Sequence, residues 1–135
     1  MPRTILFLCV QNSARSQIAE GFFKKYTGKD LVCISAGTIP ADRVNPYATE
    51  AMKEVGIDIS ANKPKLVTNE MIDQASVIIN MGCMDNDSCP SILFKKKMVD
   101  WGIEDPVGKS MERMRQIRDQ IEEKVVHLIR QLSEN

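Results

Sequence analysis

A continuous apolar run near the N-terminus restricts the fold of this chain more than any other feature. Residues 4–8 read as a strand that is not interrupted by alternating polar positions. Both faces of such a strand must be covered, as in a parallel sheet between layers of helices. The run ends at Cys9, and a short polar loop then leads into a segment with helical periodicity over residues 16–26. The chain therefore begins as a strand, a loop and a helix.

The same alternation continues to the end of the chain. Further strands are predicted at residues 31–35, 75–81 and 97–100, and a second helix begins at Pro46 with Asn45 as its cap. The last helix carries apolar residues at intervals of three and four, namely Met114, Ile117, Ile121, Val125, Leu128 and Leu132. The pattern predicts an α/β fold in which a four-stranded parallel sheet has helices on both faces.

Composition limits the kind of protein this is. The chain has 135 residues and is 43% hydrophobic, so we expect one domain over residues 1–135 with a single core. Eighteen basic residues balance eighteen acidic ones, which gives no global field for nucleic acid or an anionic membrane. We find no signal segment or membrane span and expect a cytoplasmic protein, in which the four cysteines are reduced at rest.

The loop of residues 9–16 has the composition of an oxyanion site. A cysteine, five residues, an arginine and a serine stand between the predicted strand and helix. The backbone N–H groups of a tight loop and the start of a helix attract a tetrahedral anion. Arg15 adds a planar fork for two oxygens, and the same field favours Cys9 as a thiolate nucleophile. The residues expected to surround the anion are Val10, Gln11, Asn12, Ser13, Ala14, Arg15 and Ser16.

Two residues of this loop have additional expected roles. Ser16 can donate a hydrogen bond to the sulfur of Cys9, and Asn12 suits a backbone position with positive φ, where its amide holds the loop in shape. A lone cysteine at the end of a strand is more often a buried core residue. Here the strand, the spacing, the arginine, the hydroxyl and the helix agree, which favours the catalytic interpretation.

Three segments that are distant in sequence are expected at the same edge of the sheet. Cys9 follows the first predicted strand, Cys83 follows the third and Asp105 follows the fourth. Ligands of such sheets bind outside the carboxyl ends of the strands. A partly desolvated Asp105 on the rim would be the general acid that protonates a leaving oxygen, although an ordinary turn before the last helix is the alternative.

These motifs resemble the low-molecular-weight protein tyrosine phosphatase superfamily. The resemblance spans the first strand and its loop, residues 35–37 and 81–83, the Asp105-Pro106 pair and the last helix. It implies a phosphatase-like three-layer sandwich.

Within this superfamily the chain is most similar to the thioredoxin-coupled arsenate reductases. Those enzymes carry two further redox cysteines where this chain has Cys83 and Cys89. The phosphatases usually have tyrosines directly after the Asp-Pro pair, whereas this chain has Val107 and Gly108.

The resemblance implies a three-cysteine relay for arsenic detoxification. Cys9 attacks arsenate held by Arg15, and Asp105 protonates the departing oxygen. Cys83 then attacks Cys9 and arsenite leaves, after which Cys89 attacks Cys83 and frees Cys9. The final disulfide, Cys83–Cys89, is reduced by thioredoxin. The resemblance further implies a monomer without a tightly bound cofactor, in which phosphate or sulfate competes with arsenate.

Some reductases of this family bind a potassium ion beside the loop. The corresponding residues here are Asn12, Glu20 and Ser35, but Lys65 stands where those enzymes have an acidic residue. We therefore expect no metal, and interpret the four residues as a supporting network in which the lysine ammonium replaces the cation.

Other interpretations stay open at this stage. The main alternative is a phosphatase for phosphotyrosine or a small phosphomonoester that uses Cys9, Arg15 and Asp105. A non-enzymatic oxyanion or redox sensor is a third. A zinc site at Cys83 and Cys89 is disfavoured, because no other cysteine or histidine pair completes four ligands. The remaining candidates, Cys33 and His127, are expected to be a small core residue and a structural or surface residue.

Overall fold

Four parallel strands form the centre of the computed structural model, which describes residues 3–82 and 98–133. They are β1 (Arg3–Cys9), β2 (Leu31–Gly37), β3 (Val77–Asn80) and β4 (Met98–Asp100). Their order across the sheet is β2-β1-β3-β4, so β1 is a central strand, as its continuous apolar run predicts. Cys83 and Cys89 lie outside the described residues.

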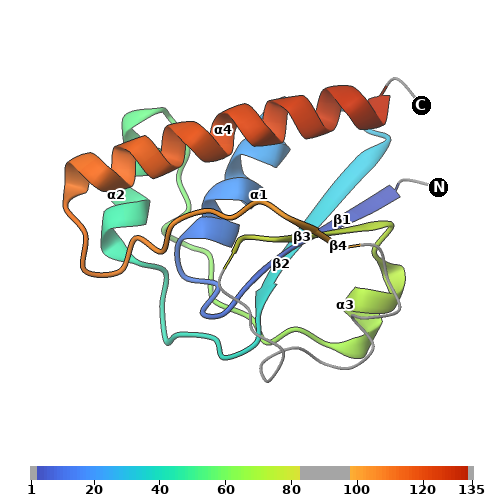
Figure 1. Cartoon of the computed structure of the whole chain (residues 1–135), viewed down its shortest axis with the longest axis horizontal. Coiled ribbons are helices and arrows are strands. Elements are labelled where there is room, and N and C mark those ends of the chain that lie inside the picture. Colours follow the sequence, from blue (N-terminus) through green and yellow to red (C-terminus); the bar gives the residue numbers. More distant parts are fainter. Residues whose placement is uncertain (1–2, 83–97, 134–135) are drawn as a thin grey trace.

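Helices cover both faces of the sheet, which confirms the predicted fold class (Figure 1). On one face lie α1 (Arg15–Tyr26), α2 (Pro46–Glu54) and α4 (Met111–Ser133), and α3 (Asn69–Gln74) lies on the other. Alternate residues of β1 serve the two layers: Ile5 and Phe7 pack with α1 and α4, whereas Leu6 and Leu8 pack with α3.

Local sequence signals account for most of these elements. The Asn45 side chain accepts the Tyr47 N–H at 2.8 Å and Pro46 opens α2, as the sequence predicts. Helix α3 was not predicted; the Thr68 hydroxyl caps it by accepting the Met71 N–H at 3.1 Å. Strand β3 is shorter than expected, because α3 occupies the chain up to Gln74 and Ala75 is its cap.

Glycine brings β2 close to the loop after β1. Gly37 pairs with Cys9 in the sheet, and a Cβ atom on it would lie 2.4 Å from the Val10 carbonyl oxygen and 3.0 Å from the Asn12 nitrogen. Any larger residue would therefore push the 9–16 loop away from the sheet.

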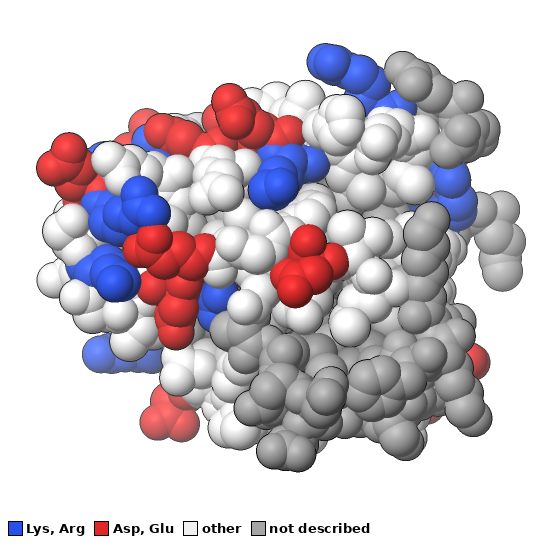
Figure 2. Space-filling model, viewed as in Figure 1, with Lys and Arg blue, Asp and Glu red and all other residues white. Residues whose placement is uncertain are grey.

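Charges are mixed over the surface. Figure 2 shows basic and acidic side chains interspersed on the face that it displays, in keeping with the zero net charge of the chain. In the described ranges, the helices are too short or too polar for a membrane span.

Candidate active site

The sulfur of Cys9 faces a backbone N–H and a hydroxyl group. Cys9 ends β1 and is buried, and its Sγ accepts the Asn12 N–H at 3.2 Å. The Ser16 Oγ lies 3.0 Å from the same sulfur. Donors at this distance stabilise a thiolate more than a thiol, since they interact with the charged form. The loop is thus arranged for a nucleophilic sulfur.

The orientation of the Asn12 amide decides which way the Ser16 hydroxyl points. The Lys65 backbone N–H, which can only donate, lies 2.9 Å from the Asn12 Oδ1. The Asn12 Nδ2 must therefore face Ser16, and it donates to the Ser16 Oγ at 2.7 Å. Because that oxygen already accepts a hydrogen bond from Asn12, its own hydrogen is available for the Cys9 sulfur. Asn12 has a φ of 51°, as the sequence predicts for this position.

Gln17 and Asn62 extend this chain of hydrogen bonds away from the sulfur. The Gln17 Nε2 donates to the Asn12 backbone oxygen at 3.2 Å and to its Oδ1 at 3.1 Å. The Asn62 Nδ2 in turn donates to the Gln17 Oε1 at 3.1 Å. Neither residue is predicted from the sequence. The one available signal is the position of Gln17 directly after Ser16, where the predicted helix begins.

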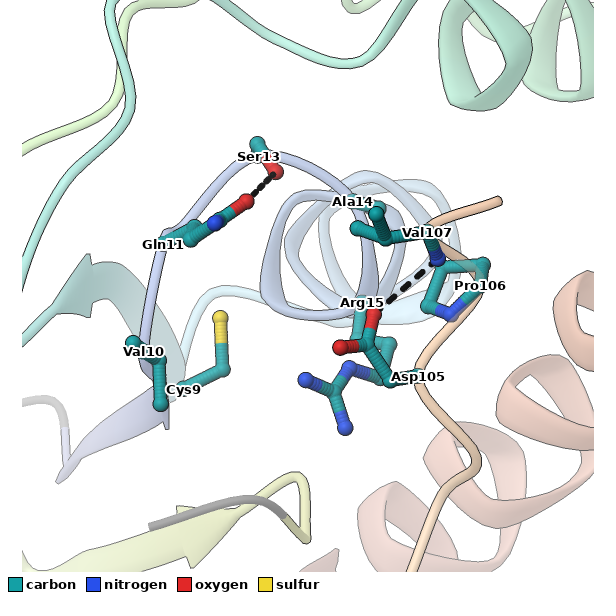
Figure 3. A pocket seen from close by; sticks show the side chains of 9 residues that line it. All are labelled: Cys9, Val10, Gln11, Ser13, Ala14, Arg15, Asp105, Pro106 and Val107. Atoms are coloured by element: carbon teal, nitrogen blue, oxygen red, sulfur yellow. Dashed lines mark hydrogen bonds between the residues drawn. The ribbon is translucent and has the colours of Figure 1, made fainter. Parts of the chain in front are cut away.

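Arg15 is buried at the start of α1, beside the segment that joins β4 to α4. Its Nη1 donates to the Ile103 carbonyl oxygen at 2.9 Å. In the view of Figure 3 the guanidinium lies between the Cys9 sulfur and the Asp105 carboxylate. The cationic group and the nucleophile therefore line the same pocket.

A pocket of about 200 Å³ opens above the loop. Its lining consists of Cys9, Val10, Gln11, Ser13, Ala14, Arg15, Asp105, Pro106 and Val107 (Figure 3). The structure thus brings Asp105 to the same site as Cys9, although the two residues are 96 positions apart in the sequence. The Asp105 Oδ1 accepts the Val107 N–H at 3.0 Å. Asp105 is exposed, which corrects the expectation that it is partly desolvated.

The chain that leads to Cys83 runs directly against the Asp105 segment. A Cβ atom on Gly82 would lie 2.8 Å from the Ile103 nitrogen and 3.0 Å from Gly102. Gly82 has a φ of 118°, which few other residues adopt. The ends of β1 and β3 and the Asp105 segment therefore meet at one edge, as the parallel topology predicts. The position of Cys83 itself lies outside the described residues.

The predicted supporting network is only partly present. Lys65 contacts Asn12 through its backbone N–H and not through its ammonium. The Glu20 carboxylate is buried and pairs with Lys24 at 3.9 Å. The Ser35 hydroxyl is buried and, within the described part of the chain, has no hydrogen-bond partner. The role expected for the Lys65 ammonium is therefore not supported by these contacts.

Comparison with known proteins defines the class. The model of the family described as low molecular weight phosphotyrosine protein phosphatase matches residues 4–135. The chain belongs to this family, which confirms the resemblance inferred from the sequence. Over 119 residues it is 42% identical to Arsenate reductase 1 of Staphylococcus saprophyticus, covering 88% of this chain and 90% of that protein.

Solved structures point to the same family. One described as an arsenate reductase in the phosphate binding state has a TM-score of 0.85 at 37% identity, covering 96% of this chain and 98% of that one. The YwlE arginine phosphatase from Geobacillus stearothermophilus has a TM-score of 0.88 at 25% identity, covering 98% and 94%. A thioredoxin-dependent arsenate reductase from Corynebacterium glutamicum has 0.79 at 33%, covering 98% of this chain and 63% of that one.

Proposed function

We propose that this chain is an arsenate reductase that converts arsenate to arsenite with electrons from thioredoxin. The observation that supports this most is the Cys9 sulfur, which has donors from Ser16 and Asn12 at the base of a pocket bordered by Arg15 and Asp105. Relatives at 42% identity with the name arsenate reductase, and the presence of Cys83 and Cys89 in the sequence, favour reduction as the outcome.

The first step is displacement at arsenic. Arsenate lies above Cys9, with its oxygens held by the loop N–H groups and the Arg15 guanidinium. The Cys9 thiolate forms a sulfur–arsenic bond, and an arsenic–oxygen bond breaks. Asp105 gives a proton to the departing oxygen, which leaves as water. Arsenic is still in the +5 state in the resulting adduct.

The second step transfers two electrons. The Cys83 thiolate attacks the Cys9 sulfur, so that a disulfide forms and the sulfur–arsenic bond breaks. The bonding pair stays with arsenic, which leaves as arsenite in the +3 state. Cys89 then attacks the Cys83 sulfur, which releases the Cys9 thiolate and forms the Cys83–Cys89 disulfide. Reduced thioredoxin converts this disulfide back to two thiols and is itself oxidised.

Several properties follow from this mechanism. The protein requires no tightly bound cofactor, because thiols carry all the electrons. Phosphate and sulfate compete with arsenate, since all three are tetrahedral oxyanions of similar size. We further infer that the enzyme acts as a monomer in the cytoplasm, where a thioredoxin system keeps its thiols reduced.

Phosphatase activity is the second candidate. The same loop, arginine and aspartate can hydrolyse a phosphate ester if water attacks the Cys9 adduct, and the likeness to the YwlE arginine phosphatase favours this outcome. The two candidates differ in their need for Cys83, because hydrolysis requires no second thiol.

A pair of assays on three proteins separates the candidates. Arsenite formation with thioredoxin, thioredoxin reductase and NADPH is measured beside hydrolysis of p-nitrophenyl phosphate. We expect Cys83→Ser to abolish arsenite formation and to leave ester hydrolysis intact, and Cys33→Ser to leave both rates unchanged. Arsenite formation that survives in Cys83→Ser would contradict the relay. Rapid ester hydrolysis without arsenite formation by the wild type would establish a phosphatase instead.

A further inference from the structure

One short segment between β4 and α4 links the two charged groups of the site. It contains Asp105, and it accepts a hydrogen bond from Arg15. The Ile103 N–H donates to the Met81 carbonyl oxygen at 2.8 Å, which joins the segment to the end of β3. The carbonyl oxygen of the same residue accepts from Arg15 at 2.9 Å. Two positions later, Asp105 lines the pocket. A shift of this segment would therefore move the acid and remove a partner of the arginine.

Glu104 stands between Ile103 and Asp105 in the sequence and does not line the pocket. Its carboxylate accepts from the Nε of Arg113 at 3.0 Å and also from the Nη2 of Arg113, so the pair is bidentate. This bonding lowers the pKa of Glu104 below its ordinary value, and the carboxylate stays charged at neutral pH. The segment is thus attached to the first turns of α4 at the residue between Ile103 and Asp105.

Arg113 is itself held in place. Its backbone N–H donates to the Ser110 hydroxyl at 3.1 Å, and its Nη1 donates to the Gln116 Oε1 at 2.5 Å. A guanidinium with these additional bonds presents its fork in a fixed orientation, so that less side-chain entropy opposes the pair than at an isolated surface ion pair.

We propose that Glu104 and Arg113 are positioning residues for the site, which hold Asp105 toward the pocket and the Ile103 carbonyl against Arg15. The proposal deepens the proposed function and rests on it for the role of Asp105. Neither side chain lines the pocket, so both act through the segment. Loss of the pair is expected to weaken anion binding and to slow protonation of the leaving oxygen.

The chain contains a matched control for this pair. Arg115 is also on α4 and forms a bidentate pair with Glu54 of α2, whose carboxylate accepts from Arg118 as well. The two pairs have similar exposure, with fractions of 44% and 36% for Arg113 and Glu104 against 45% and 33% for Arg115 and Glu54. Only the first pair contacts the Asp105 segment. Arg113→Gln and Arg115→Gln therefore lose the same charge and the same kind of bond.

Binding of inorganic phosphate, measured by calorimetry, tests the proposal without any turnover. We expect Arg113→Gln to weaken phosphate binding by about two- to fivefold, the range of a well-formed surface pair, and Arg115→Gln to leave it unchanged. Arg113→Lys, which keeps the charge but not the fork, should lie between wild type and Arg113→Gln. Equal phosphate affinity in Arg113→Gln and Arg115→Gln would overturn the proposal.

Glu104→Gln separates positioning from simple electrostatics by the sign of its effect. Removal of a carboxylate near an anion site strengthens anion binding if charge alone matters. If the pair positions the site, Glu104→Gln weakens phosphate binding instead. Tighter or unchanged binding would therefore overturn the proposal.

Turnover supplies the second readout. In the arsenate reaction, Arg113→Gln should lower kcat more than it raises KM, because a displaced Asp105 delivers its proton to the leaving oxygen less effectively. Arg115→Gln should keep the wild-type kcat and KM. A wild type that binds phosphate but forms no arsenite would refute the proposed function, while the phosphate affinities would still decide the role of the pair.

Discussion

Two cysteines on neighbouring strands have opposite surroundings. Cys9 is the last residue of β1, whereas Cys33 lies within β2, where it pairs with Ile5. Both are shielded from solvent to a large extent, Cys9 more than Cys33. Burial alone therefore cannot explain why one thiol is suited to be a nucleophile and the other is not.

The difference lies in the groups that face each sulfur. The Cys9 Sγ meets a backbone N–H and a hydroxyl whose hydrogen points toward it. The Cys33 Sγ instead lies 3.9 Å from the Glu20 carbonyl oxygen, an acceptor, with the Glu20 charge nearby. Burial, followed by the Glu20 carboxylate, raises the pKa of Cys33 to about 12. The donors that face Cys9 suit its sulfur to act as a nucleophile, whereas burial and the Glu20 charge keep the Cys33 thiol protonated.

The largest expected effect tests this comparison directly. Cys9→Ser removes the nucleophile and should lower arsenate turnover by on the order of 10⁴-fold or more, the scale seen when an enzyme nucleophile is removed. Cys33→Ser, which replaces a protonated thiol by a hydroxyl of similar size, should keep turnover at the wild-type level. Arsenite release by each purified variant is the measurement. A large loss of turnover in a correctly folded Cys33→Ser protein would contradict the assigned difference.

The sequence indicated the Cys9 environment because its chemistry is local. The loop residues, the positive φ of Asn12 and the start of α1 all lie within eight positions of one another. The cap of α2 was equally readable, since Asn45 and Pro46 are adjacent. Helix α3 was not, because six residues give too little periodicity to detect and its stability depends on the Thr68 cap and on packing.

The contacts that complete the site could not be predicted in the same way. The bond from Arg15 to the Ile103 carbonyl joins residues 88 positions apart. The bonds from Asn62 to Gln17 and from Lys65 to Asn12 depend on where the chain after α2 returns to the loop. The sheet topology predicts which segments meet, but individual hydrogen bonds depend on packing that no local pattern encodes.

A smaller effect is expected when only one donor is removed. Ser16→Ala deletes the hydroxyl that faces the Cys9 sulfur, and a hydrogen bond to a charged group contributes about 1.5–3 kcal/mol. We therefore expect iodoacetamide to alkylate Cys9 at least about tenfold more slowly at neutral pH, because the hydroxyl no longer stabilises the charged sulfur that attacks the reagent. Peptide mass spectrometry follows each cysteine separately.

Ser13→Ala is the matched control for this experiment. Ser13 belongs to the same loop, but its hydroxyl faces the Gln11 Oε1 at 3.4 Å and not the sulfur. Its removal should leave the rate of Cys9 alkylation unchanged. Equal rates for Ser16→Ala and wild type would show that the hydroxyl does not donate to the sulfur.

The smallest expected effect is a change in the pKa of Cys33, which a nearby negative charge raises and a nearby positive charge lowers. Burial is the larger cause of its raised pKa, so Glu20→Gln should lower that pKa but leave it above the ordinary value of 9.0. Alkylation of Cys33 at pH 9 should then become faster, by about tenfold at most, since one pKa unit changes the thiolate fraction tenfold.

Lys24 acts in the opposite direction, because its positive charge lowers the pKa of Cys33. Lys24→Gln should therefore slow alkylation. If both variants shifted the rate in the same direction, structural loosening and not charge would control the reactivity of the Cys33 thiol.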